Sequence, residues 1–126
     1  MKYIPFPKLL AQYVKDWAPV GSRETVNPPP QDTDQDYMVL CAGLQQLNQL
    51  KKAITSDGFT VDGKNYEGTT WTSYRKGDLN LIVTCDNRLY YRTVRAARIC
   101  KALNLKDKED RITVHGMLRQ LYQGML

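Results

Sequence analysis

Sulfur and imidazole ligands are scarce in this sequence of 126 residues. It holds three cysteines, none of them in a CxxC pair, and a single histidine, His115. A structural zinc site needs four such ligands in closely spaced pairs, so the sequence gives no support to one. The odd number of cysteines and their wide separation indicate reduced thiols that pack in the core.

Long apolar runs are also missing. No stretch approaches the roughly 20 apolar residues that a membrane-spanning helix needs. The first residues, MKYIPFPKLLAQYVKDW, carry prolines and charges where a signal peptide would have its apolar region. We therefore expect a protein without a membrane partner that works in the cytoplasm.

Acidic residues are fewer than basic ones, 13 against 18, which gives a formal net charge of +5. An excess of positive charge favours polyanionic partners such as nucleic acids or nucleotides, without choosing between them. The hydrophobic share of 42% and the charged share of 25% are typical of globular proteins. The length suits a single domain over residues 1–126 with one hydrophobic core.

Apolar periodicity and turn residues predict an α+β fold. We expect helices over residues 7–17, 44–54, 87–103 and 108–123, strands over 36–41 and 78–85, and a β-hairpin over 59–77 with its turn at Asp62 and Gly63. Asp86 or Asn87 is well placed to cap the third of these helices. This order suggests a small mixed β-sheet with helices packed on one face.

Three aspartates stand out because strand geometry can bring them together. Asp34 and Asp36 are two residues apart and would project from the same face of the first strand. Asp78 opens the second strand and shares a face with Asn80. If the strands are neighbours, the three carboxylates form a cluster that needs a cation, and hard oxygen ligands select Mg²⁺ or Mn²⁺.

The acidic stretch also has two interpretations that involve no catalytic metal. DTDQDY begins like a calcium-binding EF-hand loop, but Tyr37 stands where that loop needs glycine and Gly43 where it needs glutamate. The EF-hand is therefore rejected. Aspartates that merely cap and solubilise a loop remain an alternative for Asp34 and Asp36 taken alone.

A Gly-Ser turn upstream of the acids favours phosphate chemistry. Glycine at position 21 lets backbone N–H groups approach an anion, and the Ser22 hydroxyl adds a donor. Arg23 follows the turn and could contact a phosphate. A phosphate-binding turn and metal-binding acids are the parts that phosphoryl transfer requires.

These segments resemble a known superfamily. VGSRE, the strand TDQDYMVL and the later GDLNLIV are similar to the signature of the polymerase-β-like nucleotidyltransferases. KGDLNLIVTCD and ALNLKDKEDRI also resemble short nucleotidyltransferase-like proteins of tailed bacteriophages. The resemblance covers the middle of the chain, and the phage-type similarity extends into its C-terminal third.

The resemblance implies roles for the motif residues. Gly21 and Ser22 would bind the triphosphate of an NTP, and Asp34 and Asp36 would be ligands of Mg²⁺ or Mn²⁺. Asp78 would be the third acid, a metal ligand that helps to deprotonate the attacking hydroxyl, although Asn80 on the same face leaves the register of that position open.

On this basis the expected activity is transfer of a nucleoside monophosphate to an acceptor, with RNA, including tRNA ends, favoured. Two alternatives stay open. One is a weakly active or inactive member that binds nucleic acid or a host protein, as a phage regulatory or counter-defence factor would in the host cytoplasm. The other is a small domain that is active only with a second subunit.

A basic helix is the last candidate feature. Arg88, Arg92 and Arg95 fall within a narrow arc of the helix expected over residues 87–103. Because that helix follows the strand of the third acid, we expect its first turns near the rim of the active site, where they would contact a phosphate backbone or triphosphate. An ordinary solvated helix face explains the same residues equally well.

Overall fold

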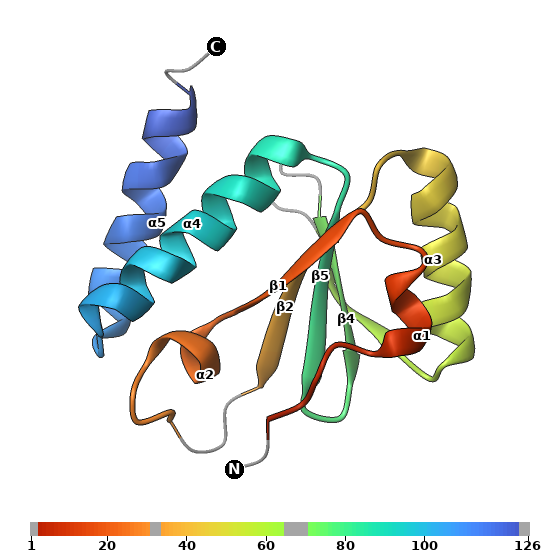
Figure 1. Ribbon diagram of the computed structural model, residues 1–126, viewed down its shortest axis with the longest axis horizontal. Coiled ribbons are helices and arrows are strands. Elements are labelled where there is room, and N and C mark those ends of the chain that lie inside the picture. Colours follow the sequence, from red (N-terminus) through yellow and green to blue (C-terminus); the bar gives the residue numbers. More distant parts are fainter. Residues whose placement is uncertain (1–2, 31–33, 65–70, 124–126) are drawn as a thin grey trace.

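The computed structural model describes residues 3–30, 34–64 and 71–123 of the chain (Figure 1). Five strands form one mixed sheet in the order β1-β2-β5-β4-β3. Their bounds are β1 Asp16–Val20, β2 Gln35–Leu40, β3 Thr60–Lys64, β4 Trp71–Lys76 and β5 Leu79–Thr84. The central pair, β2 and β5, is parallel, and the other pairs are antiparallel. The α+β class and the mixed sheet expected from the sequence are confirmed.

The helices cover both faces of this sheet. Their bounds are α1 Lys8–Ala11, α2 Ser22–Thr25, α3 Leu44–Ser56, α4 Asn87–Leu103 and α5 Lys108–Gln123. One core cluster joins α1 and α3 to the sheet through Leu10, Leu50 and Ile54, and a second joins α4 through Tyr90 and Val94. The structure thus differs from the expected packing on one face, because β2 and β5 are apolar on both sides and each side needs cover.

The helix expected over residues 7–17 is wrong in its second half. Only Lys8–Ala11 is helical, and Asp16–Val20 forms the edge strand β1. This strand pairs antiparallel with β2, and its ladder hydrogen bonds replace those of a helix. Pro19 cannot continue a helix but is tolerated at a sheet edge, so strand pairing prevails over the helical spacing of the apolar residues.

The remaining elements lie close to their expected positions. Asp86 caps α4, since its side chain accepts hydrogen bonds from the backbone N–H groups of Arg88 at 3.0 Å and Leu89 at 3.2 Å. The hairpin is formed by β3 and β4, but Gly63 lies within β3, at a register shift, instead of in a turn. The segment that joins the two strands lies outside the described residues.

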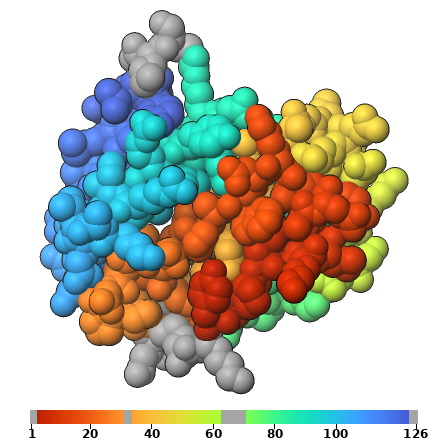
Figure 2. All heavy atoms as spheres, viewed as in Figure 1, coloured from red at the N-terminus to blue at the C-terminus, as the bar shows by residue number. Residues whose placement is uncertain are grey.

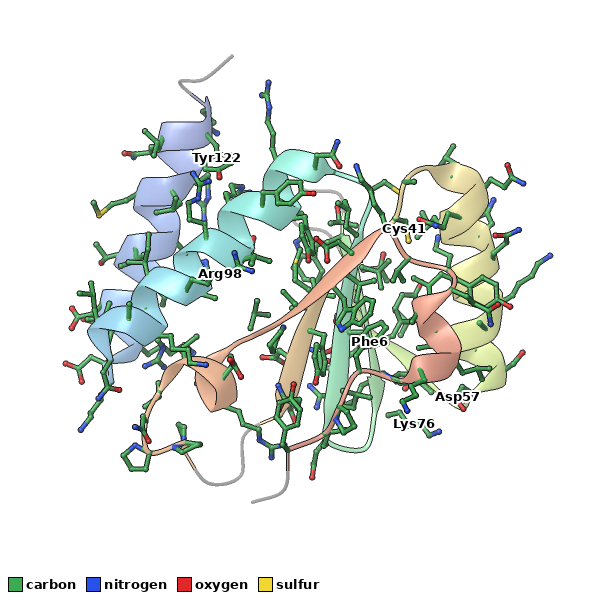
Figure 3. All side chains as sticks on the ribbon, in the orientation of Figure 1. Phe6, Cys41, Asp57, Lys76, Arg98 and Tyr122 are labelled. Atoms are coloured by element: carbon green, nitrogen blue, oxygen red, sulfur yellow. The ribbon has the colours of Figure 1, made fainter. Side chains whose placement is uncertain are left out.

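Two views show how the layers sit. The N-terminal segment and β1 cover the centre of the molecule, and α4 and α5 form a continuous side next to them (Figure 2). Phe6 anchors this N-terminal segment by stacking on Trp17 with ring centroids 4.7 Å apart (Figure 3). In the part of the chain described here, no helix is long and apolar enough to span a bilayer.

Candidate active site

The DxD motif lies at the start of the central strand. Asp34 directly precedes β2, and Asp36 is the second residue of that strand. Across the sheet, Asp36 is in register with Val20 on β1 and with Asn80 on β5. The parallel pairing of β2 and β5 brings the two sequence segments together as expected. The candidate site therefore lies at the amino ends of the two parallel strands.

Gly21 places the Gly-Ser turn against Asp36. Its backbone has φ 80° and ψ 175°, a region open essentially to glycine alone. A Cβ atom at this position would overlap the Oδ2 atom of Asp36. The absence of a side chain thus lets the carboxylate pack on the turn that opens α2. The Gly-Ser turn and the second acid of the DxD motif are therefore neighbours in the fold.

Burial sets the electrostatic state of Asp36. Its carboxyl group is largely desolvated, which raises its pKa above the ordinary value, and the nearby charge of Asp34 raises it further. The hydrogen bond from Asn80 and the positive charges of Arg75 and Arg23 oppose the shift. The net rise in the pKa means that burial outweighs the hydrogen bond and the positive charges that favour the ionised carboxylate.

Asn80 occupies the position opposite Asp36 on the neighbouring strand. Its Nδ2 atom donates a hydrogen bond to Asp36 Oδ1 at 3.1 Å. Its own Oδ1 atom is buried and has no hydrogen-bond partner among the described residues. A buried amide oxygen without a donor carries an energetic penalty that an added ligand or water would remove. Strand alternation places Asn80 on the face expected for Asp78, and the pairing of β2 with β5 sets it opposite Asp36.

Arg75 holds the other acid of the motif. Its Nη1 atom is 2.7 Å from Asp34 Oδ2, and its Nη2 atom is 3.1 Å from Asp62 Oδ2. The hydrogen bond to Asp34 is the main reason that the pKa of Arg75 lies above its ordinary value. Arg75 is also in register with Asn80 on β5. One guanidinium therefore neutralises Asp34 and bridges it to the outer strand β3.

Asp78 does not join the other two carboxylates. It lies in the tight turn between β4 and β5, where it is exposed, and its backbone oxygen accepts a hydrogen bond from the Gln35 N–H at 2.8 Å. Its backbone is thus beside the motif, but within the described residues no three acidic, cysteine or histidine side chains form a group that could hold a metal. The expected three-carboxylate cluster is not assembled. Asp78 still belongs to the turn, because β5 begins one residue later, at Leu79.

Arg23 lies close to the acids from the side of α2. Its charge is among those that lower the pKa of Asp36, and its Nε atom is buried without a hydrogen-bond partner in the part of the chain that is described. A neighbouring helix holds α2 in place, because Lys101 Nζ lies 2.7 Å from Glu24 Oε1. The Gly-Ser turn is therefore accompanied by a guanidinium with an unused donor.

The donor set fits one divalent ion bound together with phosphate. Mg²⁺ is usually held by one or two carboxylates, with waters and substrate phosphates completing its shell. Asp34 and Asp36 supply two carboxylates, and the unpaired Oδ1 atom of Asn80 adds a hard oxygen.

The basic residues of α4 lie elsewhere. Asp36 and Asn80 mark the amino ends of β2 and β5, whereas Asp86 begins α4 after the carboxyl end of β5. Four residues of strand, about 13 Å, separate Asn80 from Thr84. The expectation that the first turns of α4 border the active site is therefore wrong, because a parallel strand carries the chain away from the acids before the helix starts. Arg88 and Arg92 are on those distant turns (Figure 1).

A cavity of about 460 Å³ lies at that same carboxyl end of β5, among side chains of α3 and β4. Trp71, Leu44 and Cys85 are among the residues that line it. None of the acids of the DxD motif contributes to its wall, so the cavity is separate from the candidate site.

Comparison with known proteins adds evidence on the fold. No protein-family model and no curated protein sequence matches the chain. Among solved structures, Cid1 poly(U) polymerase, determined as a mutant bound to MgATP, has a TM-score of 0.55 at 14% sequence identity. A cytoplasmic RNA terminal U-transferase has a TM-score of 0.51, also at 14% identity.

The similarity covers most of this chain and a minor part of each larger protein. It extends over 79% of this chain and 34% of the poly(U) polymerase, and over 82% of this chain and 30% of the U-transferase. The chain thus spans about one third of the length of these structural relatives. Together with the mixed sheet and the placement of the Gly-Ser turn beside the DxD motif, the comparison shows that the chain has a nucleotidyltransferase-like fold.

Proposed function

We propose that the chain transfers a nucleoside monophosphate from an NTP to the hydroxyl group of an acceptor, with RNA as the favoured acceptor and tRNA ends among the candidates. The observation that carries this proposal is the seating of Asp36 against the Gly21 turn, with Asp34 two residues away. Hydrogen-bond donors for a phosphate and carboxylates for a metal ion would meet there, as phosphoryl transfer requires.

The reaction follows from the parts of the site. The acceptor hydroxyl attacks the α-phosphorus of the NTP, a new P–O bond forms, and the bond to the β-phosphate breaks to release pyrophosphate. A bound Mg²⁺ or Mn²⁺ would supply charge neutralisation for the attacking and leaving oxygens. Asp34, Asp36 and the Oδ1 atom of Asn80 would hold it, and the Gly21–Ser22 turn with Arg23 would bind the triphosphate.

The proton of the acceptor hydroxyl needs a base. The sequence resemblance assigns this role to Asp78, whose side chain is exposed in the turn beside Gln35. Within the proposal, Asp78 therefore acts from the rim of the site, where the acceptor would enter.

The structural relatives, a poly(U) polymerase and an RNA terminal U-transferase, support RNA as the acceptor class.

A transfer assay tests the proposal. Each radiolabelled NTP is incubated with the protein, Mn²⁺ or Mg²⁺ and host RNA, and the label in RNA is measured. We expect the native chain to transfer label and the Asp34→Asn, Asp36→Asn double variant to transfer none.

The matched control is Asp62→Asn. It removes the other acidic partner of Arg75 and leaves both aspartates of the DxD motif unchanged. It should retain transfer. Equal activity in the double variant, or no activity of the native chain with any NTP, would contradict the proposal.

A second candidate function is favoured by Asn80. An amide stands opposite Asp36 where an acid would complete a three-carboxylate cluster, which favours a weakly active or inactive protein that binds nucleic acid or a host protein through the same scaffold. If the chain is phage-encoded, as the sequence resemblance suggests, either role belongs to the host cytoplasm. This candidate predicts little or no transfer, with binding that is unchanged in the Asp34→Asn, Asp36→Asn variant.

A further inference from the structure

Five arginines on α4 and α5 form a positively charged surface. Within the described part of the chain no acidic side chain forms an ion pair with any of them: Arg88, Arg92, Arg95, Arg98 and Arg119. The ion pairs of the described residues involve Arg75, Lys76 or Lys101 instead. Surface arginines that pair with no acid of their own protein are available to an anionic partner.

The two helices bring like charges together at their contact. Arg92 and Arg119 repel each other, and this repulsion, after desolvation, lowers the pKa of Arg92. Both arginines also lie near His115. Burial of this imidazole and the charges of the two arginines lower its pKa below the ordinary value. Asp86 is the acid that opposes these effects at Arg92. The fold thus holds unfavourable charge at one place, which an anion would relieve.

Aromatic rings lie among these charges. Tyr91, next to Arg92 on α4, is 43% exposed. Tyr122 on α5 receives the guanidinium of Arg95 at 5.6 Å from its ring centroid (Figure 3). Aromatic rings interleaved with arginines are a platform on which unpaired bases stack while the cations contact the phosphates.

We propose that the α4–α5 basic face, formed by the five arginines Arg88, Arg92, Arg95, Arg98 and Arg119, binds the phosphate backbone of single-stranded RNA. The choice of RNA over DNA rests on the proposed function, whereas the charge and the aromatic rings stand independently of it. The exposed ring of Tyr91 favours a single strand, since bases in a duplex are already stacked.

The direction of α4 connects this face to the candidate active site. The helix begins at the far end of the sheet and runs back to α2, where Lys101 pairs with Glu24 and the Asn27 N–H donates to Asn104 Oδ1 at 3.0 Å. Figure 1 shows the carboxyl end of α4 beside α2. The nine residues from Arg92 to Lys101 span about 14 Å of helix, the length of roughly four stacked nucleotides. RNA on the basic face would therefore reach the Gly21 turn only if it is longer than about four nucleotides.

RNA binding by the full chain tests the proposal. Fluorescence anisotropy with a labelled 12-nucleotide RNA of mixed sequence is measured over a range of salt concentrations. For Arg92→Gln with Arg119→Gln we expect the magnitude of the log–log salt slope to fall by about 1.4 and binding to weaken roughly 25-fold at 0.1 M salt, from two lost phosphate contacts.

The control variant carries the same charge change on the other face of the sheet. Lys8→Gln with Lys52→Gln removes two exposed cations from α1 and α3 and should leave both quantities near their native values. Because the arginine substitutions remove a repulsion, thermal stability should be retained or increase, so lost binding would not reflect unfolding. Three outcomes would each overturn the proposal. The arginine variant keeps the native affinity and salt slope, the native chain binds no RNA, or DNA of the same sequence binds equally well.

The only histidine of the chain gives a second readout. RNA phosphates at Arg92 and Arg119 should raise the pKa of His115, which proton NMR of its single imidazole follows directly. An imidazole signal that keeps its position and its titration in saturating RNA would overturn the proposal.

Failure of this proposal and failure of the proposed function have different signatures. Loss of transfer in Asp36→Asn with intact RNA binding supports both. Arginine-dependent RNA binding by a native chain that transfers no label supports the basic face and contradicts the enzyme.

Discussion

Asn80 on β5 donates a hydrogen bond from Nδ2 to Asp36 Oδ1 across the two central parallel strands, at 3.1 Å. The contact fixes the carboxylate of the DxD motif from the side opposite Gly21. It also means that the position directly opposite Asp36 carries an amide in place of a third acid. In the proposed metal site, binding would therefore depend on two carboxylates and one neutral oxygen.

Converting Asn80 to aspartate should change both the stability of the fold and its stabilisation by a metal ion. In Asn80→Asp, the hydrogen bond to Asp36 is lost and a like charge is added, so without metal the melting temperature at neutral pH should fall by several degrees. Mn²⁺ should then stabilise the variant more than the native chain, because three carboxylates bind it more tightly. Thermal unfolding with and without Mn²⁺ measures both effects. An equal Mn²⁺ shift in both proteins would show that position 80 does not contact the ion.

Removal of the buried charge should separate stability from activity. The folded-state pKa of Asp36 is raised, so its charge destabilises the native state once the pH exceeds the ordinary value near 3.8, and stability is lost as the pH rises through the raised pKa. Asp36→Asn should therefore abolish transfer and raise the melting temperature at pH 7. Urea unfolding of both proteins at pH 7 and at pH 4 measures the change in unfolding free energy. The stabilisation of the variant should be smaller at pH 4. A destabilised variant at pH 7 would contradict this electrostatic account.

Gly21 should tolerate no side chain. Gly21→Ala places a Cβ atom against the Asp36 carboxylate and strains the backbone at φ 80°, which should cost about 1 to 3 kcal/mol of unfolding free energy and most of the transfer activity. The matched control is Gly116→Ala in α5, where an added Cβ meets nothing within 4 Å. It should gain roughly 0.5 to 1 kcal/mol from helix propensity. Urea unfolding of both variants checks the prediction, and similar changes in the two would contradict it.

Arg75 should compete with a metal ion for Asp34. Its guanidinium lies 2.7 Å from the Asp34 carboxylate, so Arg75→Gln should free that ligand and tighten Mn²⁺ binding severalfold in the absence of nucleotide. Lys76→Gln is the control, because Lys76 lies on the same strand and pairs with Asp57 instead. Isothermal titration with Mn²⁺ measures both affinities. Unchanged or weaker Mn²⁺ binding in Arg75→Gln would show that the ion pair does not block the site.

Local sequence patterns were sufficient for most elements of the fold. The spacing of apolar residues in α3, α4 and α5 and the cap at Asp86 are local signals, and the structure follows them. The segment around Trp17 has the same helical spacing but forms β1, because its hydrogen bonds go to a strand about twenty residues away. A periodicity argument has no access to such a partner.

The candidate site, too, is predictable only where local sequence geometry decides it. Alternation along a strand pairs Asp34 with Asp36 and places Asn80 on the face of Asp78, and both relationships need only local geometry. The ion pair of Asp34 with Arg75 depends on the order of strands in the sheet, which the sequence does not reveal. The exposed position of Asp78 depends on the residue at which a turn gives way to β5, and boundaries of that kind vary by one or two residues.

The register of β1 on β2 has a consequence for how this site can vary. Val20 pairs with Asp36 and Trp17 with Val39, so the ladder alone sets the distance between the Gly21 turn and the acids. Val26 and the residues directly after it take no part in this ladder. Extra residues inserted after Val26 should therefore lengthen the loop without shifting the site, at a small entropic cost that grows slowly with length. Related chains could differ there in length and still keep the same geometry of turn and acids.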